Sequence, residues 1–339
     1  MAYETLLQVE NLAIEFGTED GIVHAVNGIS FDVCRGDVFA IVGESGSGKT
    51  VTAMSVLGLL PTPPARIASG EILWKGEDLL QADKERMRDI RGNEIAMIFQ
   101  DPLTALNPVL TVGRQIGEMV ELHRGMNRKQ ARLHAIEMLA LVGIPEPQRR
   151  VDMHPHEFSG GMRQRAMIAM AIACKPQLLI ADEPTTALDV TVQAQVLELL
   201  LSIKKELDSA IILITHDLAV VAGLATVVMV MYAGRQAEMG DVDEVFYRAA
   251  HPYTIGLHDS LPRLDGSGDE RLQPIGGQPP SMLRPPSGCA FHPRCRFADL
   301  AGRCVNEVPE LRPLGATNHR AACHFAEDIL ASSIANHNE

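Results

Sequence analysis

The chain has 339 residues, and its 43 acidic and 30 basic side chains give a formal net charge of -13 at neutral pH. At about 100–200 residues per domain the length suits two domains, and 46% hydrophobic with 22% charged residues excludes a disordered or fibrous chain. The acidic balance argues against a broad basic face for nucleic acid and against direct adhesion to anionic lipid.

The N-terminus has no signal-peptide pattern, because Glu4 stands in it and no basic segment precedes an apolar core. We therefore expect a cytosolic chain. The longest uncharged run, Leu218 to Gly234, has 17 residues, fewer than the ~20 that cross a bilayer. It predicts a short helix followed by a buried strand, VVMVMY. A role at a membrane would require partner proteins that hold the chain there.

Short apolar and often alternating stretches from Leu6 to Val42 predict strands at the start of the chain. A helical run follows from Val51 to Leu60 and ends at a proline cluster. Residues 70–99 predict two strands around a charged helix, and residues 101–158 are largely helical. After residue 160, helices alternate with the buried strands LLIAD, AIILIT and VVMVMY. This alternation indicates an α/β fold with a mainly parallel sheet.

A glycine-rich loop follows the predicted strand VFAIVG and precedes a predicted helix. Its sequence fits GxxxxGK[ST] and reads Gly43-Glu44-Ser45-Gly46-Ser47-Gly48-Lys49-Thr50. In this context the backbone N–H groups of the loop hold phosphates, Lys49 reaches the terminal phosphates and Thr50 ligates Mg²⁺. We therefore predict a nucleoside triphosphate site.

Two further polar sites stand at the ends of buried strands. LLIAD ends at Asp182-Glu183, and AIILIT is followed by His216-Asp217. An open α/β sheet binds its ligand at the carboxyl ends of its strands. We expect Asp182 to hold Mg²⁺ through water, Glu183 to orient or deprotonate the attacking water, and His216 to lie in the same pocket.

The chain resembles the ATP-binding subunits of ABC transporters over nearly all of residues 6–325. Their signature motif is matched by Ser159-Gly160-Gly161-Met162-Arg163-Gln164, with Phe158 and Met162 where the family often has Leu and Gln. The resemblance implies an ABC ATPase domain at 6–250 with a mixed, mainly parallel sheet, an antiparallel β subdomain, and a helical subdomain at about 101–158 that meets permeases.

The same resemblance implies roles for single residues. Phe16 would stack on adenine, Gln100 would sense Mg²⁺ and the membrane subunits, and Asp189 would lie at a dimer interface. The signature residues would contact the ATP bound by a partner subunit: Ser159, Gly160, Gly161, Met162 and Gln164. An exposed helix N-terminus at this motif provides a physical reason, since its free N–H groups suit a phosphate.

Residues 251–339 differ in composition from the rest, with 10 of the 20 prolines, 6 of the 12 histidines, 4 of the 6 cysteines and no lysine. The four cysteines are Cys289, Cys295, Cys304 and Cys323. Clustered thiols in a reducing compartment indicate a metal site, and four thiolates suit either zinc or an iron–sulfur cluster. Cys34 and Cys174 stand alone among apolar residues and are expected to be small core side chains.

The tail itself resembles that of ATPase subunits from dipeptide and oligopeptide importers, through HPYTIGL, GCAFHPRC, Pro309 and a final Cys-His. This resemblance implies an extension at 251–339 with a structural [4Fe-4S] cluster on the four cysteines. It leaves His292 and His324 as alternative ligands. Three arginines would offset the negative charge of the cluster: Arg294, Arg296 and Arg303.

The resemblance predicts a transport ATPase at the cytoplasmic face of the cell membrane. Two permease subunits would hold it there, a second homologous ATPase would complete a heterodimer, and an extracytoplasmic binding protein would deliver di- or oligopeptides for import. Alternatives are an importer of nickel or another small solute, and a soluble ABC ATPase acting on DNA or ribosomes. The chain lacks the long coiled coil of the DNA type and the second motif set of the ribosomal type, so no nucleic-acid partner is expected. A P-loop kinase would not explain the signature or the tail.

Overall fold

The computed structural model describes residues 4–186, 188–260 and 275–336. It separates into two compact units along the chain. Unit 1 consists of Met1–Leu7, Val33–Asp37 and Trp74–Ile214, and unit 2 of Gln8–Asp32, Val38–Leu73 and Thr215–Glu339.

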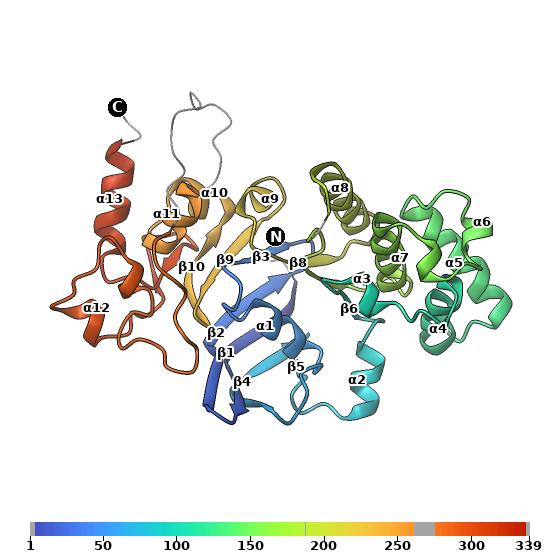
Figure 1. Ribbon diagram of the computed structural model, residues 1–339, viewed down its shortest axis with the longest axis horizontal. Helices are drawn as coiled ribbons and strands as arrows, with labels where there is room; N and C mark the ends of the chain where they lie inside the picture. The colour runs from blue at the N-terminus through green and yellow to red at the C-terminus, as the bar shows by residue number, and fades with distance from the viewer. Residues whose placement is uncertain (1–3, 187, 261–274, 337–339) are drawn as a thin grey trace. The chain divides into compact units, whose positions relative to one another are not determined.

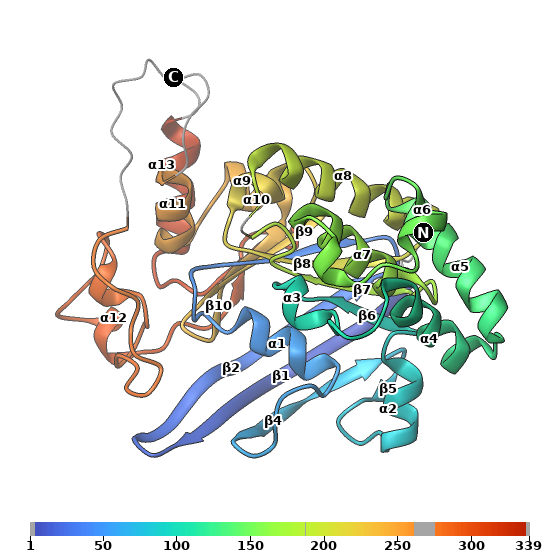
Figure 2. The same cartoon turned by 45° about the vertical axis from the view of Figure 1, so that its right-hand side comes forward.

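Unit 1 is built on three parallel strands, β6 (Ile95–Ile98), β7 (Leu178–Asp182) and β8 (Ala210–Thr215). All of their residues are buried, which is typical of a parallel sheet with both faces covered. The helices of this unit are α2 (Lys84–Ile90), α3 (Pro102–Ala105), α4 (Val112–Arg124), α5 (Arg128–Leu141), α6 (Pro147–Arg150), α7 (Gly160–Ile172) and α8 (Val190–Leu207). α4, α5 and α7 pack against one another (Figures 1 and 2), and α7 also contacts β6.

Unit 2 contains two groups of strands. The long strands β1 (Thr5–Thr18), β2 (Gly21–Cys34) and β4 (Ala65–Trp74) lie side by side in the order β2-β1-β4 (Figure 2). In the second group β3 (Val38–Val42) runs parallel to β9 (Val227–Tyr232), and β10 (Arg235–Asp241) pairs antiparallel with β9. The two-residue strand β5 (Glu77–Asp78) belongs to the segment assigned to unit 1.

Most of the predicted elements are present at the predicted places. The strands expected between residues 6 and 42 are β1, β2 and β3. The uncharged run contains α9 (Leu218–Ala222) and then β9, as predicted. The helix expected over 51–60 is α1 (Lys49–Val56), which ends four residues early because Gly58 takes a left-handed conformation with φ of 57°. Within the described part of the chain, no helix has the length and apolarity to cross a bilayer.

The tail forms part of unit 2. Its short strands β12 (Arg320–Ala321) and β11 (Arg312–Pro313) continue the sheet antiparallel beyond β10, with Glu238 opposite Ala321. α10 (Val242–Tyr247) precedes the tail, and the described helices of the tail are α11 (Pro252–Asp259), α12 (Arg303–Asn306) and α13 (Ala326–Asn336). α11 and α13 lie beside each other (Figure 1), and Ala250, Leu314, Ala321 and Ile329 form a small apolar core there.

A buried carboxylate connects β10 to the tail. Glu238 is fully buried, and it accepts hydrogen bonds from the backbone N–H of Ala250 at 2.7 Å and of His251 at 3.0 Å. Its third partner is the ring Nε2 of His319, at 2.7 Å, which is also buried. Removing one member of a buried pair leaves the other polar group without compensation.

We therefore expect Glu238→Ala to lower the free energy of unfolding by about 3–5 kcal/mol, the cost of breaking a buried polar pair. Chemical denaturation and limited proteolysis of the tail would measure the loss. Glu307→Ala is the matched control, because Glu307 is exposed and pairs only with Arg303 on the described surface; its loss should stay below ~1 kcal/mol. Equal stability of the two variants would contradict this assignment.

Candidate functional site

The glycine loop has the backbone that phosphate binding requires. Gly43, Gly46 and Gly48 have φ of 152°, 79° and 101°, a range that other residues rarely adopt. A Cβ on Gly43 would stand 2.2 Å from the carbonyl oxygen of Met231, and one on Gly48 would stand 2.5 Å from that of Ala25. Glycine is therefore required at both positions, and the loop leads directly from β3 into α1.

Lys49 is almost fully buried, and its Nζ donates to the carbonyl oxygens of Gly43 at 2.7 Å and Glu44 at 3.0 Å. The ammonium thus lies across the loop that the sequence assigned to phosphates. Ser47 Oγ is buried and has no hydrogen-bond partner among the described residues. A buried hydroxyl without a partner is costly, so this atom fits a ligand that accepts or donates hydrogen bonds, such as a phosphate. Thr50, on the first turn of α1, is half-buried.

Unit 1 brings together two of the predicted catalytic residues. Gln100 follows β6 and Glu183 follows β7, and because these strands are parallel neighbours their ends lie at one edge. Gln100 Nε2 donates to Glu183 Oε2 at 3.1 Å, and Thr186 Oγ1 donates to the same oxygen at 2.9 Å. Glu183 also has φ of 46°, a strained conformation that is frequent at functional positions. Asp182 is buried at the end of β7.

His216 and Phe16 belong to unit 2. His216 is exposed directly after β8, at the position predicted from the strand end. Phe16 is half-buried near the end of β1. Their predicted roles, at the nucleotide pocket and on adenine, stay predictions.

The signature residues do not all have the same surroundings. Ser159 is the N-cap of α7 and accepts a hydrogen bond from the Met162 N–H at 3.4 Å, and Ser159 and Gly160 are exposed. Gln164, in contrast, is buried, and its Nε2 donates to the carbonyl oxygen of Pro184 at 2.7 Å. Its amide therefore holds the segment after Glu183. Asp189 is the exposed N-cap of α8 and accepts from the Val192 N–H at 3.0 Å.

The four tail cysteines converge. Together with Phe291, Phe297 and Phe325 they line one small cavity, and all four are free thiols. Burial raises the pKa of Cys295 to about 11 and that of Cys323 to about 12. Among the described residues, no three His, Cys, Asp or Glu side chains stand close enough to hold a single metal ion. The isolated cysteines differ: Cys174 is buried as expected, whereas Cys34 is only half-buried.

Each of the three tail arginines forms an ion pair with a carboxylate, and their role in offsetting the charge of a cluster stays a prediction. Arg296 pairs with Asp259 at 3.4 Å and Arg303 with Glu307 at 3.2 Å. Arg294 pairs with Glu44 of the glycine loop at 2.6 Å. No sequence pattern pointed to this pair, since 250 residues separate its members.

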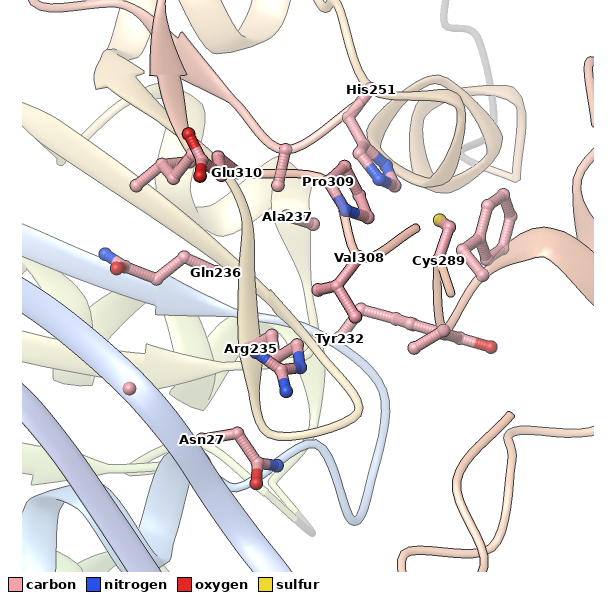
Figure 3. Close-up of a pocket in the computed structure, with 15 residues that line it drawn as sticks. Asn27, Tyr232, Arg235, Gln236, Ala237, His251, Cys289, Val308, Pro309 and Glu310 are labelled. Atoms are coloured by element: carbon pink, nitrogen blue, oxygen red, sulfur yellow. The ribbon is translucent and has the colours of Figure 1, made fainter. Parts of the chain in front are cut away.

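A separate pocket of about 370 Å³ lies in unit 2 between β10 and the tail (Figure 3). Arg235, Gln236 and Ala237 contribute one wall, and Val308, Pro309 and Glu310 contribute another. Of the residues that line it, only Cys289 belongs to a predicted site. Arg235 and Glu310 are exposed, so the pocket has no buried charge, and we assign it no part in the chemistry.

Comparison with known proteins agrees with this geometry. Residues 26–186 match the family described as ABC transporter, and residues 237–304 match that described as oligopeptide/dipeptide transporter, C-terminal region. Similar proteins include the dipeptide transport ATP-binding protein DppD of Bacillus subtilis (strain 168), 56% identical over 86% of this chain and 87% of its own. The oligopeptide transport ATP-binding protein OppD of Escherichia coli (strain K12) is 51% identical over 96% of this chain and 95% of its own.

Solved structures share the fold of the ATP-binding region. A dimeric post-hydrolysis state of the ATP-binding cassette MJ0796, bound to ADP and Pi, has a TM-score of 0.63 and 25% identity, over 70% of this chain and 99% of that one. CbiO1 from Clostridium perfringens has a TM-score of 0.60 and 30% identity, over 72% of this chain and 91% of that one. The resemblance inferred from the motifs is confirmed: the chain is an ABC ATPase and belongs to the ATP-binding subunits of the oligopeptide/dipeptide ABC transporter family.

Proposed function

We propose that the protein couples ATP hydrolysis to the import of di- or oligopeptides. It would act at the cytoplasmic face of the cell membrane, bound to two permease subunits and to a second, different ABC ATPase subunit, with an extracytoplasmic binding protein supplying the peptide. The observation that carries this proposal is the joint presence in one chain of an ABC region at 26–186 and the oligopeptide/dipeptide transporter C-terminal region at 237–304. We also propose the division into an ATPase domain at 6–250, with its helical subdomain at about 101–158, and an extension at 251–339.

Within this function the site residues have distinct tasks. The glycine loop and Lys49 bind the phosphates, and Phe16 stacks on the adenine. Glu183 accepts a proton from the attacking water, and its Oε2 is held by the donors Gln100 and Thr186, which fix the direction of the carboxylate. His216 completes the polar set around the water.

The oxygen donors of Thr50, Asp182 and Gln100 suit Mg²⁺, a hard cation that takes oxygen ligands. When bound, Mg²⁺ supplies positive charge to the phosphate oxygens. Because Ser159 and Gly160 are exposed at the N-terminus of α7, they are suited to the ATP held by a partner subunit, together with Gly161 and Met162. Asp189 would lie at the same interface. The buried Gln164 acts on this site through the hydrogen bond from its side-chain amide to the Pro184 carbonyl oxygen.

Co-purification and uptake test the transport proposal. A tagged full-length chain should recover two permeases and one different ATPase subunit from detergent-solubilised membranes. Membranes containing the complex should take up peptides in a length series but not nickel. Recovery of two copies of this chain would refute the heterodimer, and nickel uptake or bound nucleic acid would refute the peptide proposal.

We further propose that Cys289, Cys295, Cys304 and Cys323 hold a [4Fe-4S] cluster. The alternative is zinc, which four thiolates also suit. A cluster has its own inorganic core between the thiolates, so it accepts four cysteines around a shared cavity. Ligation would displace the protons that burial keeps on the thiols of Cys289, Cys295 and Cys323.

Anaerobic reconstitution with iron and sulfide should give a brown protein, whereas a colourless protein with stoichiometric zinc would reject the cluster. Cys295→Ser should abolish the colour and lower the melting temperature of the tail while changing ATP affinity less. Cys174→Ser is the control, because Cys174 lies outside the tail and is buried beside the Met119 carbonyl oxygen. Equal iron content in the two variants would contradict the ligand assignment.

A further inference from the structure

The phosphate loop of unit 2 is contacted by the tail. The Arg294 guanidinium donates to both carboxylate oxygens of Glu44, from Nη1 at 2.6 Å and from Nη2 at 3.0 Å. In addition, the backbone N–H of Glu44 donates to Tyr253 Oη at 2.8 Å. The second residue of the loop is thus held at its side chain and at its backbone by residues that follow position 250.

Both tail residues are themselves firmly placed. Only 4% of the Arg294 side chain is exposed, and its Nε donates to the Gly276 carbonyl oxygen at 2.9 Å. The guanidinium also lies over the ring of Tyr232. Tyr253 is fully buried and packs on Tyr232 and Phe291, with ring centroids 4.6 and 5.4 Å away. A bidentate arginine in such surroundings fixes the direction of its partner as well as its charge.

The charges explain why the contact matters. The loop binds a polyanion, yet Glu44 places a carboxylate within the loop itself. Hydrogen bonding to Glu44 raises the pKa of Arg294 further above its ordinary value, so the guanidinium keeps its charge and offsets that carboxylate. Burial raises the pKa of Tyr253, whose hydroxyl therefore remains neutral beside the loop.

We propose that Arg294 and Tyr253 are positioning residues of the ATP site. They do not touch the nucleotide. Arg294 neutralises and orients Glu44, Tyr253 holds the Glu44 backbone, and together they keep the loop in its phosphate-binding form. The tail thereby forms part of the nucleotide site.

The test is a comparison of two neighbouring arginines in the full-length chain. Arg294→Met should raise the Kd for ATP about 10-fold, because it leaves a carboxylate uncompensated near the phosphates. It should raise the KM of the assembled complex by the same factor with little change in kcat. Arg296→Met is the matched control on the other side of Cys295, since Arg296 pairs with Asp259, and it should leave the Kd unchanged.

Three readouts separate this positioning role from damage to the fold. Raising the salt from about 0.05 M to about 0.5 M should shrink the loss, because screening weakens the repulsion. In a Glu44→Gln background, Arg294→Met should have little further effect on the Kd. Arg294→Lys should recover most of the affinity, because it keeps the charge.

If Arg294→Met does not fold, Tyr253→Phe carries the test. Tyr253→Phe keeps the ring packing and removes the acceptor for the Glu44 N–H, and about a 5-fold rise in Kd is expected from one lost hydrogen bond. The proposal is overturned if Arg294→Met and Arg296→Met have the same Kd. It is also overturned if the loss is independent of salt and persists in the Glu44→Gln background, or if Tyr253→Phe binds ATP like the parent.

Discussion

Glu183→Gln is expected to bind ATP with the affinity of the parent and to hydrolyse it at least about 100-fold more slowly, the usual contribution of a general base. Glutamine has nearly the same shape and can keep a hydrogen bond with Gln100 or Thr186, so the site stays assembled. It cannot take a proton from water. The dimer that closes on ATP should therefore persist, and single-turnover hydrolysis together with the ATP content of the isolated dimer would measure this.

The control for this variant is Glu198→Gln. Glu198 is an exposed carboxylate on α8 in the same unit, so its loss should leave hydrolysis unchanged. Hydrolysis by Glu183→Gln at the parental rate would show that another group accepts the proton, and the role of Glu183 would be wrong.

Lys49→Ala is expected to lose ATP binding, with a Kd at least about 100-fold higher, because a buried cation faces the phosphates at low effective dielectric. The same ammonium donates hydrogen bonds to the Gly43 and Glu44 carbonyl oxygens, so the substitution also removes two hydrogen bonds that stabilise the loop. Equilibrium binding of a fluorescent ATP analogue would measure the affinity, and a melting curve would confirm that the chain is folded.

Lys129→Ala is the matched control, since Lys129 is exposed on α5, and it should bind ATP normally. The two active-site variants also test the proposed roles together, in which Lys49 binds ATP and Glu183 acts in its hydrolysis. If Lys49→Ala kept the parental affinity for ATP, or if Glu183→Gln lost ATP binding as Lys49→Ala does, these separate roles would be refuted.

The local patterns predicted the phosphate loop well because strand, glycine spacing and helix follow one another in the sequence. The end of α1 was placed too late, since the decisive feature is the backbone of Gly58 rather than hydrophobic periodicity. Gln100 was named through the family resemblance alone, and its hydrogen bond to Glu183 depends on the pairing of β6 with β7, which no sequence pattern had indicated.

Contacts between distant segments could not be predicted in this way. Arg294 was assigned to the cysteines because it stands next to Cys295, whereas its guanidinium meets Glu44. Neither Glu238 nor His319 belongs to a motif, and their pairing depends on where β12 meets β10. Gln164 was grouped with the signature residues by its position in the motif alone. Its side chain is buried, and its amide donates to the Pro184 carbonyl oxygen.

The pairing of β10 with β12 has a practical consequence for experiments on shortened chains. A chain cut after residue 250 would still contain every ATP motif, yet β10 would have an open edge, and Glu238 would lose the His319 ring and its tether to the tail. Unpaired strand edges are templates for edge-to-edge association between molecules. Such a fragment does not represent the intact subunit. If the fragment self-associates, the cause is the absence of β12 beside β10 and not a property of the intact protein.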